Sequence, residues 1–258
     1  MDKPDRSQCN YSLSGAVFWL LPAILMIMLA CSVGGVTQSN PTEHPTLPAV
    51  IEKTTRPTMA PSAKKTKASP GKEETFRDSF EAKNGWEEVN KGRYTSGLVE
   101  GEVYQISFLK AGDKDYVISL QPHEYSVPLK NMVLRVWGDA LNKNGALGLV
   151  CRYQDPDNFY AFRIATDGQY WLDKYVQGKL TNLGKGNNDA ITEENTLNLE
   201  CIDKHISASV NDKVIIEIND SSLAEGNAGL FAQPMGGPLQ GKKSYQAIFD
   251  SFEMTVQP

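Results

Sequence analysis

One long apolar run lies near the start of the chain, and short segments that alternate apolar and polar residues fill its second half. Between Ala16 and Cys31 no residue is charged and no polar stripe interrupts the run. Lys3 and Arg6 precede it, and no charge follows it until Glu43. This layout is typical of an export signal or an N-terminal anchor, so it predicts that the rest of the chain is extracytoplasmic.

The sequence fits two main fates of this segment, cleavage with lipidation or retention as a membrane helix. Met28-Leu29-Ala30-Cys31 resembles a bacterial lipobox, in which the chain is cut before the cysteine and Cys31 carries the lipid. Alternatively, the apolar stretch continues to Val36, and about 20 residues rising about 1.5 Å each span a hydrocarbon core of about 30 Å as an uncleaved helix. Simple secretion is the third alternative. Residues 1–36 are therefore interpreted as a signal peptide or membrane anchor.

Residues 37–74 have the composition of a disordered linker. Pro, Thr, Ser, Ala and Lys dominate, and large apolar residues are few. Such a segment buries too little surface to offset the entropy of ordering. Its six prolines, at positions 41, 45, 48, 57, 61 and 70, predict a semi-extended spacer.

Residues 75–258 show the period-2 alternation of β-strands, and helical spacing is nearly absent. Two hairpins are predicted, with turns at Asn211-Asp212 and at Asp167-Gly168, where a type I′ turn needs residues tolerant of positive φ. Other predicted strands cover about 102–108, 115–121, 129–137, 146–153, 227–233 and 245–256. Ten or more short antiparallel strands in about 180 residues predict an all-β two-sheet sandwich or jelly roll that forms one domain.

Several segments of this region, taken in order, resemble bacterial concanavalin A-like (laminin-G-like) jelly rolls. They are FRDSFEAKNGWEEV, GLVCRYQDPDNFYAFRIATDGQYWLDKYVQGKL, LNLECIDKHISASVNDKVI, SSLAEGNAGLFA and AIFDSFEMTV. The resemblance covers about 75–258 and implies an antiparallel two-sheet jelly-roll sandwich on an exported, often membrane-tethered protein. Because this superfamily includes lectins, glucanases and adhesion modules, the resemblance implies a fold more than an activity.

Two cysteines fall within the predicted domain. Cys151 and Cys201 each occupy one of the alternate positions that are apolar in their own strand, so both are expected to face the core. In an oxidising compartment such a pair predicts a disulfide, and two buried thiols are the alternative. No Cys-x-x-Cys or His-x-x-x-His spacing supplies four zinc ligands.

Charge and catalytic patterns exclude several function classes. The net charge of −5 offers no basic surface for nucleic acid. The three histidines are scattered, so they assemble no Ser-His-Asp set, and no Glu-x-Asp-x-Glu run places two carboxylates on one strand face. The sequence therefore predicts no catalytic residue.

One set of outward positions predicts a ligand-binding surface. In three successive predicted strands, the alternate positions that point away from the core include Arg135, Trp137, Arg152 and Arg163. We expect these four side chains to form one patch. Trp171, Asp173 and Tyr175 extend it on the next strand. Guanidinium donors beside an indole suit sugar hydroxyls or carboxylates and a pyranose ring. The alternative is a solvated face with arginines laid over aromatic rings.

The similar motifs FRDSF and FDSF place Asp78 and Asp250 in terminal strands that such jelly rolls pair together. Adjacent carboxylates repel unless they are neutralised, which is the basis for predicting a structural Ca²⁺ there, since some members of the superfamily bind calcium. The alternative is that each aspartate caps a turn of its own backbone.

Together these features predict a non-catalytic, extracytoplasmic binding module that an N-terminal anchor holds at the cell membrane. Its expected partner is a glycan or another cell-surface ligand, with no cofactor apart from the calcium ion considered at Asp78 and Asp250. A jelly-roll hydrolase acting on carbohydrate and a purely structural adhesion or spacer domain are the competing interpretations.

Overall fold

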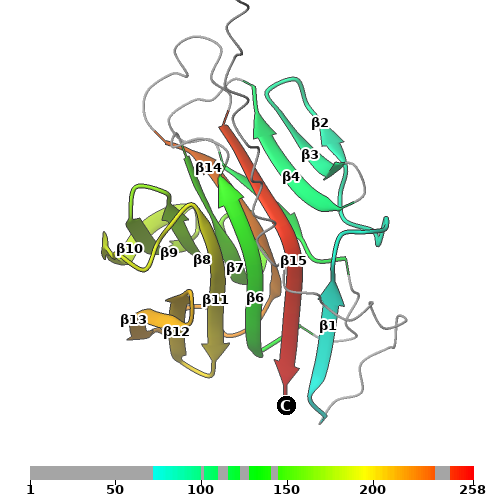
Figure 1. The fold of residues 1–258 in the computed structure, drawn as a ribbon. Coiled ribbons are helices and arrows are strands. Elements are labelled where there is room, and N and C mark those ends of the chain that lie inside the picture. Colours follow the sequence, from blue (N-terminus) through cyan, green and yellow to red (C-terminus); the bar gives the residue numbers. More distant parts are fainter. Residues whose placement is uncertain (1–71, 100–101, 110–115, 123–127, 141–144, 236–244) are drawn as a thin grey trace, which may run out of the picture. The chain divides into compact units, whose positions relative to one another are not determined.

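A computed structural model describes residues 72–99, 102–109, 116–122, 128–140, 145–235 and 245–258. The signal or anchor segment, Cys31 and most of the linker lie outside these residues. Within the described ranges the regular structure is entirely β, and no helix there is long and apolar enough to cross a bilayer. The described strands form two antiparallel sheets (Figure 1).

The larger sheet contains nine strands of the described chain. In sheet order these are β13 (Lys213–Asn219), β12 (His205–Val210), β11 (Glu194–Ile202), β6 (Asn131–Ala140), β15 (Tyr245–Gln257), β4 (Val103–Phe108), β3 (Tyr94–Val99) and β2 (Val89–Asn90), with β1 (Glu74–Asp78) also paired to β15. The two terminal strands, β1 and β15, therefore pair as the sequence predicts.

Six strands of the described chain form the smaller sheet. In sheet order they are β10 (Lys179–Asn187), β9 (Gln169–Val176), β8 (Asn158–Ala165), β7 (Gly145–Asp155), β14 (Asn227–Pro234) and β5 (Val117–Leu120). Consecutive strands β6 and β7 lie in different sheets, and this crossover decides which side chains can meet.

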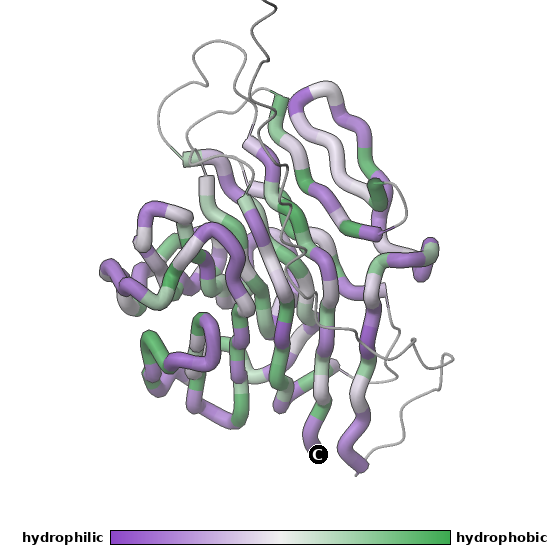
Figure 2. Tube along the Cα trace, in the orientation of Figure 1, coloured by the Kyte–Doolittle hydropathy of each residue, from purple (hydrophilic) through white to green (hydrophobic). Residues whose placement is uncertain are grey.

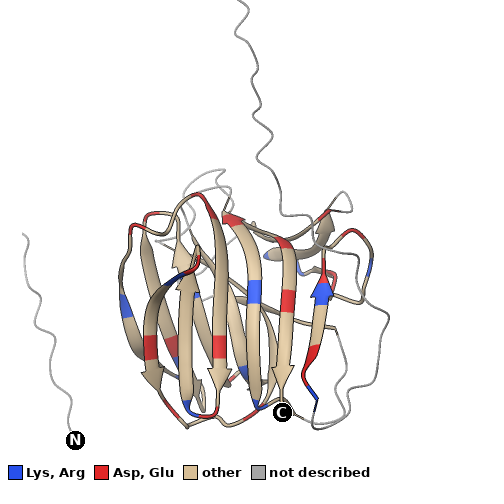
Figure 3. Cartoon of the chain, turned by 60° about the horizontal axis from the view of Figure 1, so that its bottom comes forward, with Lys and Arg blue, Asp and Glu red and all other residues tan. Residues whose placement is uncertain are grey.

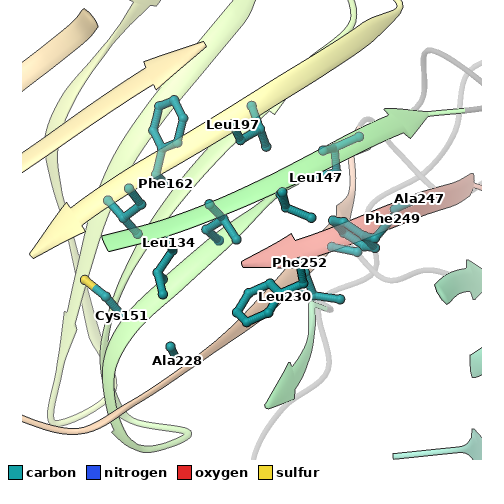
Figure 4. Packing of buried hydrophobic residues seen from close by; sticks show 14 of the residues in the cluster. Leu134, Leu147, Cys151, Phe162, Leu197, Ala228, Leu230, Ala247, Phe249 and Phe252 are labelled. Atoms are coloured by element: carbon teal, nitrogen blue, oxygen red, sulfur yellow. The ribbon is translucent and has the colours of Figure 1, made fainter. Parts of the chain in front are cut away.

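The core lies between the two sheets, where side chains of alternate residues meet. Hydropathy alternates along the strands (Figure 2). The apolar positions supply the buried core residues, because successive residues of a strand point to opposite faces. Leu134 and Phe252 from the large sheet and Phe162 and Leu230 from the small sheet are fully buried in this cluster (Figure 4). Leu149 of the small sheet is fully buried there as well. The all-β, two-sheet prediction is confirmed.

The two predicted hairpins form, but their turns differ. Asn211 and Asp212 both have positive φ, at 51° and 62°, as a type I′ turn between β12 and β13 requires. Between β8 and β9 only Gly168 has positive φ, and its N–H donates to the carbonyl of Ala165 at 3.0 Å. The type I′ prediction was wrong at this second turn, because the loop is longer and needs a single left-handed residue.

A disulfide joins the two sheets. Cys151 on β7 and Cys201 on β11 are bonded, with their Cα atoms 6.7 Å apart. Both are fully buried among the core residues. The predicted bond is confirmed, and it ties β7 of the small sheet to β11 of the large sheet.

Candidate functional site

The residues predicted to form one patch lie in separate places. Arg135 and Trp137 are on β6 of the large sheet, whereas Arg163 is on β8 of the small sheet. Because side chains that point out of a sandwich leave its two sheets in opposite directions, these residues cannot share a surface. The single-patch prediction was wrong, since strand alternation fixes the face of each strand but not the sheet that the strand joins.

The outer face of the large sheet has the character of a solvated surface. Positive and negative side chains alternate across β1, β15 and β6, where Arg77, Glu253 and Arg135 are neighbours in register (Figure 3). Arg135 also lies 3.4 Å from the carboxylate of Asp212, and both side chains are largely exposed. Exposed pairs of this kind contribute little to stability.

Arg152 is buried instead of facing outward. It occupies an irregularity of β7 between Cys151 and Asp155 and has a φ of 51°, which reverses the alternation. Its guanidinium donates to three backbone carbonyls, those of Leu223 at 2.9 Å, Lys130 and Asp203. Burial lowers the pKa of Arg152. The residue is a structural anchor, and the prediction that its side chain faces outward was wrong.

A polar cluster beside Arg152 fixes the segment that follows β13. Tyr160 donates to one oxygen of Asp220 and Lys174 to the other, each at 2.5 Å. Burial opposes ionisation of Asp220, but the hydrogen bonds from Lys174, Tyr160 and Ser222 outweigh it and hold the pKa of Asp220 well below its usual range. Burial, with the hydrogen bond to Asp220, raises the pKa of Tyr160 to about 12. These groups position backbone and lie away from the outer faces.

Arg163 and Trp171 do meet, on the outer face of the small sheet. They are directly opposite in register on β8 and β9, and the guanidinium carbon of Arg163 lies 4.4 Å from the centre of the indole. Arg163 Nε donates to Asp173 Oδ2 at 2.9 Å, and Asn182 of β10 donates to Asp173 Oδ1 at 2.8 Å. Asp173 is 1% exposed, whereas Trp171 remains partly exposed. We call these four residues the Arg163 cluster.

An aromatic cluster lies on the same outer face. Tyr175 stacks on Phe159 with ring centroids 4.3 Å apart, and Tyr116 touches both rings and that of Phe231. Tyr153 contacts Phe159 from β7. Phe159 and Phe231 are fully buried even though they point away from the main core. This aromatic cluster of Tyr116, Tyr153, Phe159, Tyr175 and Phe231 gives the face an apolar floor beside the Arg163 cluster.

The tyrosines of this face are hydrogen-bonding groups and not charges. Burial, reinforced by the negative charge of Asp173, raises the pKa of Tyr175 to about 12. Burial also raises the pKa values of Tyr116 and Tyr153. All three therefore stay protonated at neutral pH. Tyr116 donates its hydroxyl proton to the carbonyl of Pro156 at 3.0 Å, which holds its ring across the face.

Only part of this face was predicted from the sequence. Arg163, Trp171, Asp173 and Tyr175 were proposed as site residues, and the structure brings them together. Phe159 and Phe231 were missed because strands apolar on both faces look like ordinary core strands. Asn182 was missed because β10 has no clear alternation, although its pairing to β9 brings that amide to Asp173.

Asp78, the last residue of β1 in the large sheet, accepts hydrogen bonds that hold the local backbone and side chains. Its Oδ1 accepts from the N–H of Phe80 at 2.8 Å and from Asn84, and its Oδ2 accepts from the indole N–H of Trp86 at 3.0 Å. Register places Asp78 opposite Phe252, two positions from Asp250, so the two aspartates are not direct cross-strand partners. No group of three His, Cys, Asp or Glu among the described residues could hold a metal ion. Calcium binding here stays a prediction.

Comparisons with known proteins find similar structures but no similar sequences. No protein-family model matches the sequence, and neither does any curated protein. The structure is similar to a mixed linkage glucan GH16 protein from Bacteroides ovatus, in complex with a G4G4G3G product, with a TM-score of 0.50, 11% identity and coverage of 69% of this chain and 99% of that one. A glycoside hydrolase family 16 endo-glucanase from Bacteroides ovatus gives a TM-score of 0.50 at 10% identity over 69% and 99% of the two chains.

The fold is an antiparallel two-sheet jelly roll. At such low identities the similarity shows the fold alone. The carbohydrate-binding module CBM66 from Bacillus subtilis is a further similar structure, with a TM-score of 0.47, 18% identity and coverage of 64% of this chain and 92% of that chain. What this jelly roll binds therefore depends on its own residues.

Proposed function

We propose that this jelly roll binds a carbohydrate on the outer face of its six-stranded sheet. The observation that supports this proposal is the juxtaposition of a partly exposed indole, Trp171, with the Arg163 guanidinium and the exposed amide of Asn182. An aromatic surface stacks on the apolar face of a sugar ring, while fixed polar groups orient its hydroxyls. Of the aromatic cluster, Tyr116 and Tyr153 are partly exposed and add apolar surface on the same sheet, whereas the other three rings are buried beneath it.

The same cluster argues against cleavage of the sugar. A glycosidase that retains or inverts configuration uses two carboxyl groups, one as acid and one as nucleophile or base. Asp173, the carboxylate beside Trp171, accepts hydrogen bonds on both oxygens, from Arg163 and from Asn182. Its cross-strand neighbours on either side are Ala161 and Asn182, so no second carboxylate faces it in register. The arrangement supports a binding role.

Replacing Trp171 by alanine should lower affinity for a carbohydrate ligand by roughly 1–3 kcal/mol, because the stacking surface is lost. The ligand is first found by screening the full chain on a glycan array, and affinity is then measured by calorimetric titration with the strongest hit. Trp137→Ala is the matched control, since Trp137 is a partly exposed tryptophan on the outer face of the other sheet.

Loss of affinity in Trp171→Ala together with normal binding by Trp137→Ala supports the proposed face. Equal affinities of both variants and the original chain would move the site elsewhere. An array with no bound glycan would favour a structural adhesion or spacer role. Melting curves of both variants separate loss of binding from loss of folding.

We also propose that the jelly roll is held at a membrane by its N-terminal segment. The support is the uncharged run from Ala16 to Cys31, which follows Lys3 and Arg6 and precedes the proline-rich linker. These residues lie outside the described part of the structure. The linker of residues 37–74 would then keep the binding face clear of the membrane.

Mass spectrometry of the membrane fraction tests the mode of anchoring. If the lipobox is used, the mature chain begins at Cys31 and carries added acyl mass on that residue. An intact N-terminus at Met1 in the membrane fraction rules out the lipoprotein and supports the uncleaved helix. Recovery of the whole protein in the soluble fraction contradicts both forms of anchor.

A further inference from the structure

We infer that the carbohydrate bound here is acidic, with a sugar carboxylate held by Arg163 and Lys185. This inference rests on the proposed function, because it assigns a substrate class to the same face. Lys185 of β10 is directly opposite Trp171 in register, and Trp171 is directly opposite Arg163. The indole therefore lies between two positive side chains on adjacent strands.

Register and packing place Lys185 on the outer face. Its neighbour Gly184 pairs with the buried Leu172, and a Cβ added to Gly184 would lie 2.2 Å from Ile216 Cδ1 of the other sheet. Since successive residues of a strand point to opposite sides, Lys185 points away from the sandwich, as Trp171 does. Lys185 is exposed, and it forms no ion pair with any residue that the structure describes.

The Arg163 side chain is only 11% exposed, but the two terminal nitrogens of its guanidinium have no hydrogen-bond partner among the described residues. Its bond to Asp173 uses Nε. A guanidinium presents a second pair of parallel N–H donors along the edge formed by its two terminal nitrogens. That edge matches the spacing of the two oxygens of a carboxylate. Asp173 and the stack on Trp171 hold the group in one orientation, so little entropy is lost on binding.

The local charge fits an anion better than a neutral sugar. Arg163 and Lys185 contribute two positive charges and Asp173 one negative charge, which is paired with Arg163 and also accepts a hydrogen bond from the Asn182 amide. The three charged groups together therefore leave one positive charge in excess. The excess positive charge stands out on a chain whose net charge is −5. A sugar ring that stacks on Trp171 would bring a ring carboxylate within reach of either cation. Uronic acids carry a carboxylate of this kind on the ring.

The test compares matched acidic and neutral ligands by calorimetric titration of the full chain. The probes are oligomers of galacturonate, glucuronate, mannuronate and guluronate, each beside its carboxyl-reduced form, which keeps the linkage and loses the charge. At least one acidic oligomer should bind about tenfold or more tighter than its reduced form, because charge-assisted hydrogen bonds are lost on reduction. The preference should shrink as salt concentration rises.

Two variants assign the preference to these residues. Lys185→Gln should weaken binding of the acidic form about two- to fivefold and leave the reduced form unaffected, as expected for an exposed charge. Arg163→Lys keeps a positive charge beside Asp173 but removes the two-donor edge, so it should abolish most of the preference. Lys179→Gln is the matched control, because Lys179 is an exposed lysine of the same strand opposite Val176, on the other face.

Equal binding of acidic and reduced oligomers would overturn the inference while leaving the proposed carbohydrate site in place. Binding only of neutral or only of sulfated glycans on the array would do the same. An unchanged preference in both Lys185→Gln and Arg163→Lys would also overturn it. Failure of every glycan to bind would instead remove the proposed function itself.

Discussion

Removing the disulfide should lower the free energy of unfolding by about 4 kcal/mol, measured by urea denaturation of the double variant Cys151→Ala, Cys201→Ala. The bond closes a loop with a sequence separation of 50. In the chain-entropy model, a loop of that length restricts the unfolded chain by about that amount. Alanine avoids placing two serine hydroxyls in the apolar core, where both cysteines are fully buried.

Reduction of the original chain is the control for this prediction, because it breaks the bond and leaves both side chains in place. The reduced chain and the double variant should share most of the loss. A midpoint for the double variant equal to that of the oxidised protein would show that the bond contributes nothing. A loss in the double variant with none on reduction would assign the effect to the cavities left by the two sulfur atoms.

The fold could be predicted because its signals are local. Alternation identified most of the central strands, and Asn211-Asp212 marked its hairpin by the positive φ that both residues adopt. The parity of Cys151 and Cys201 placed both in the core, where they are bonded. Strand β10 was missed because most of its side chains are exposed, so no buried face imposes a pattern on its sequence.

The candidate site was only half predicted, because a site depends on how strands assemble. Parity correctly put Arg163 and Trp171 on one face of adjacent strands that share a tight hairpin. The same reasoning grouped Trp137 with them, yet β6 pairs with β11 and β15 in the other sheet. The two-residue period of a strand does not show which of the two sheets the strand joins, because strands of both sheets have the same alternation.

Arg152 shows a second limit of strand patterns. The run Leu147, Leu149 and Cys151 faces the core, so strict alternation turns position 152 outward. A single residue in the left-handed conformation interrupts this alternation, and here that residue is Arg152 itself, so its side chain turns inward. Its charge is then buried among backbone carbonyls without a carboxylate in direct contact among its described partners. Such an arrangement is stable only because several acceptors share the charge.

Replacing Arg152 by methionine should destabilise the domain by about 3–5 kcal/mol, because the carbonyls of Leu223, Lys130 and Asp203 lose their donors in a buried site. Urea denaturation of the variant measures the loss. Arg135→Met is the matched control: it removes the same charge from an exposed position and should change stability by about 0.5 kcal/mol or less. Equal stabilities for the two variants would contradict the structural role of Arg152. If Arg152→Met is too unstable to purify, Arg152→Lys, which restores one donor group, should recover part of the loss and keep the comparison measurable.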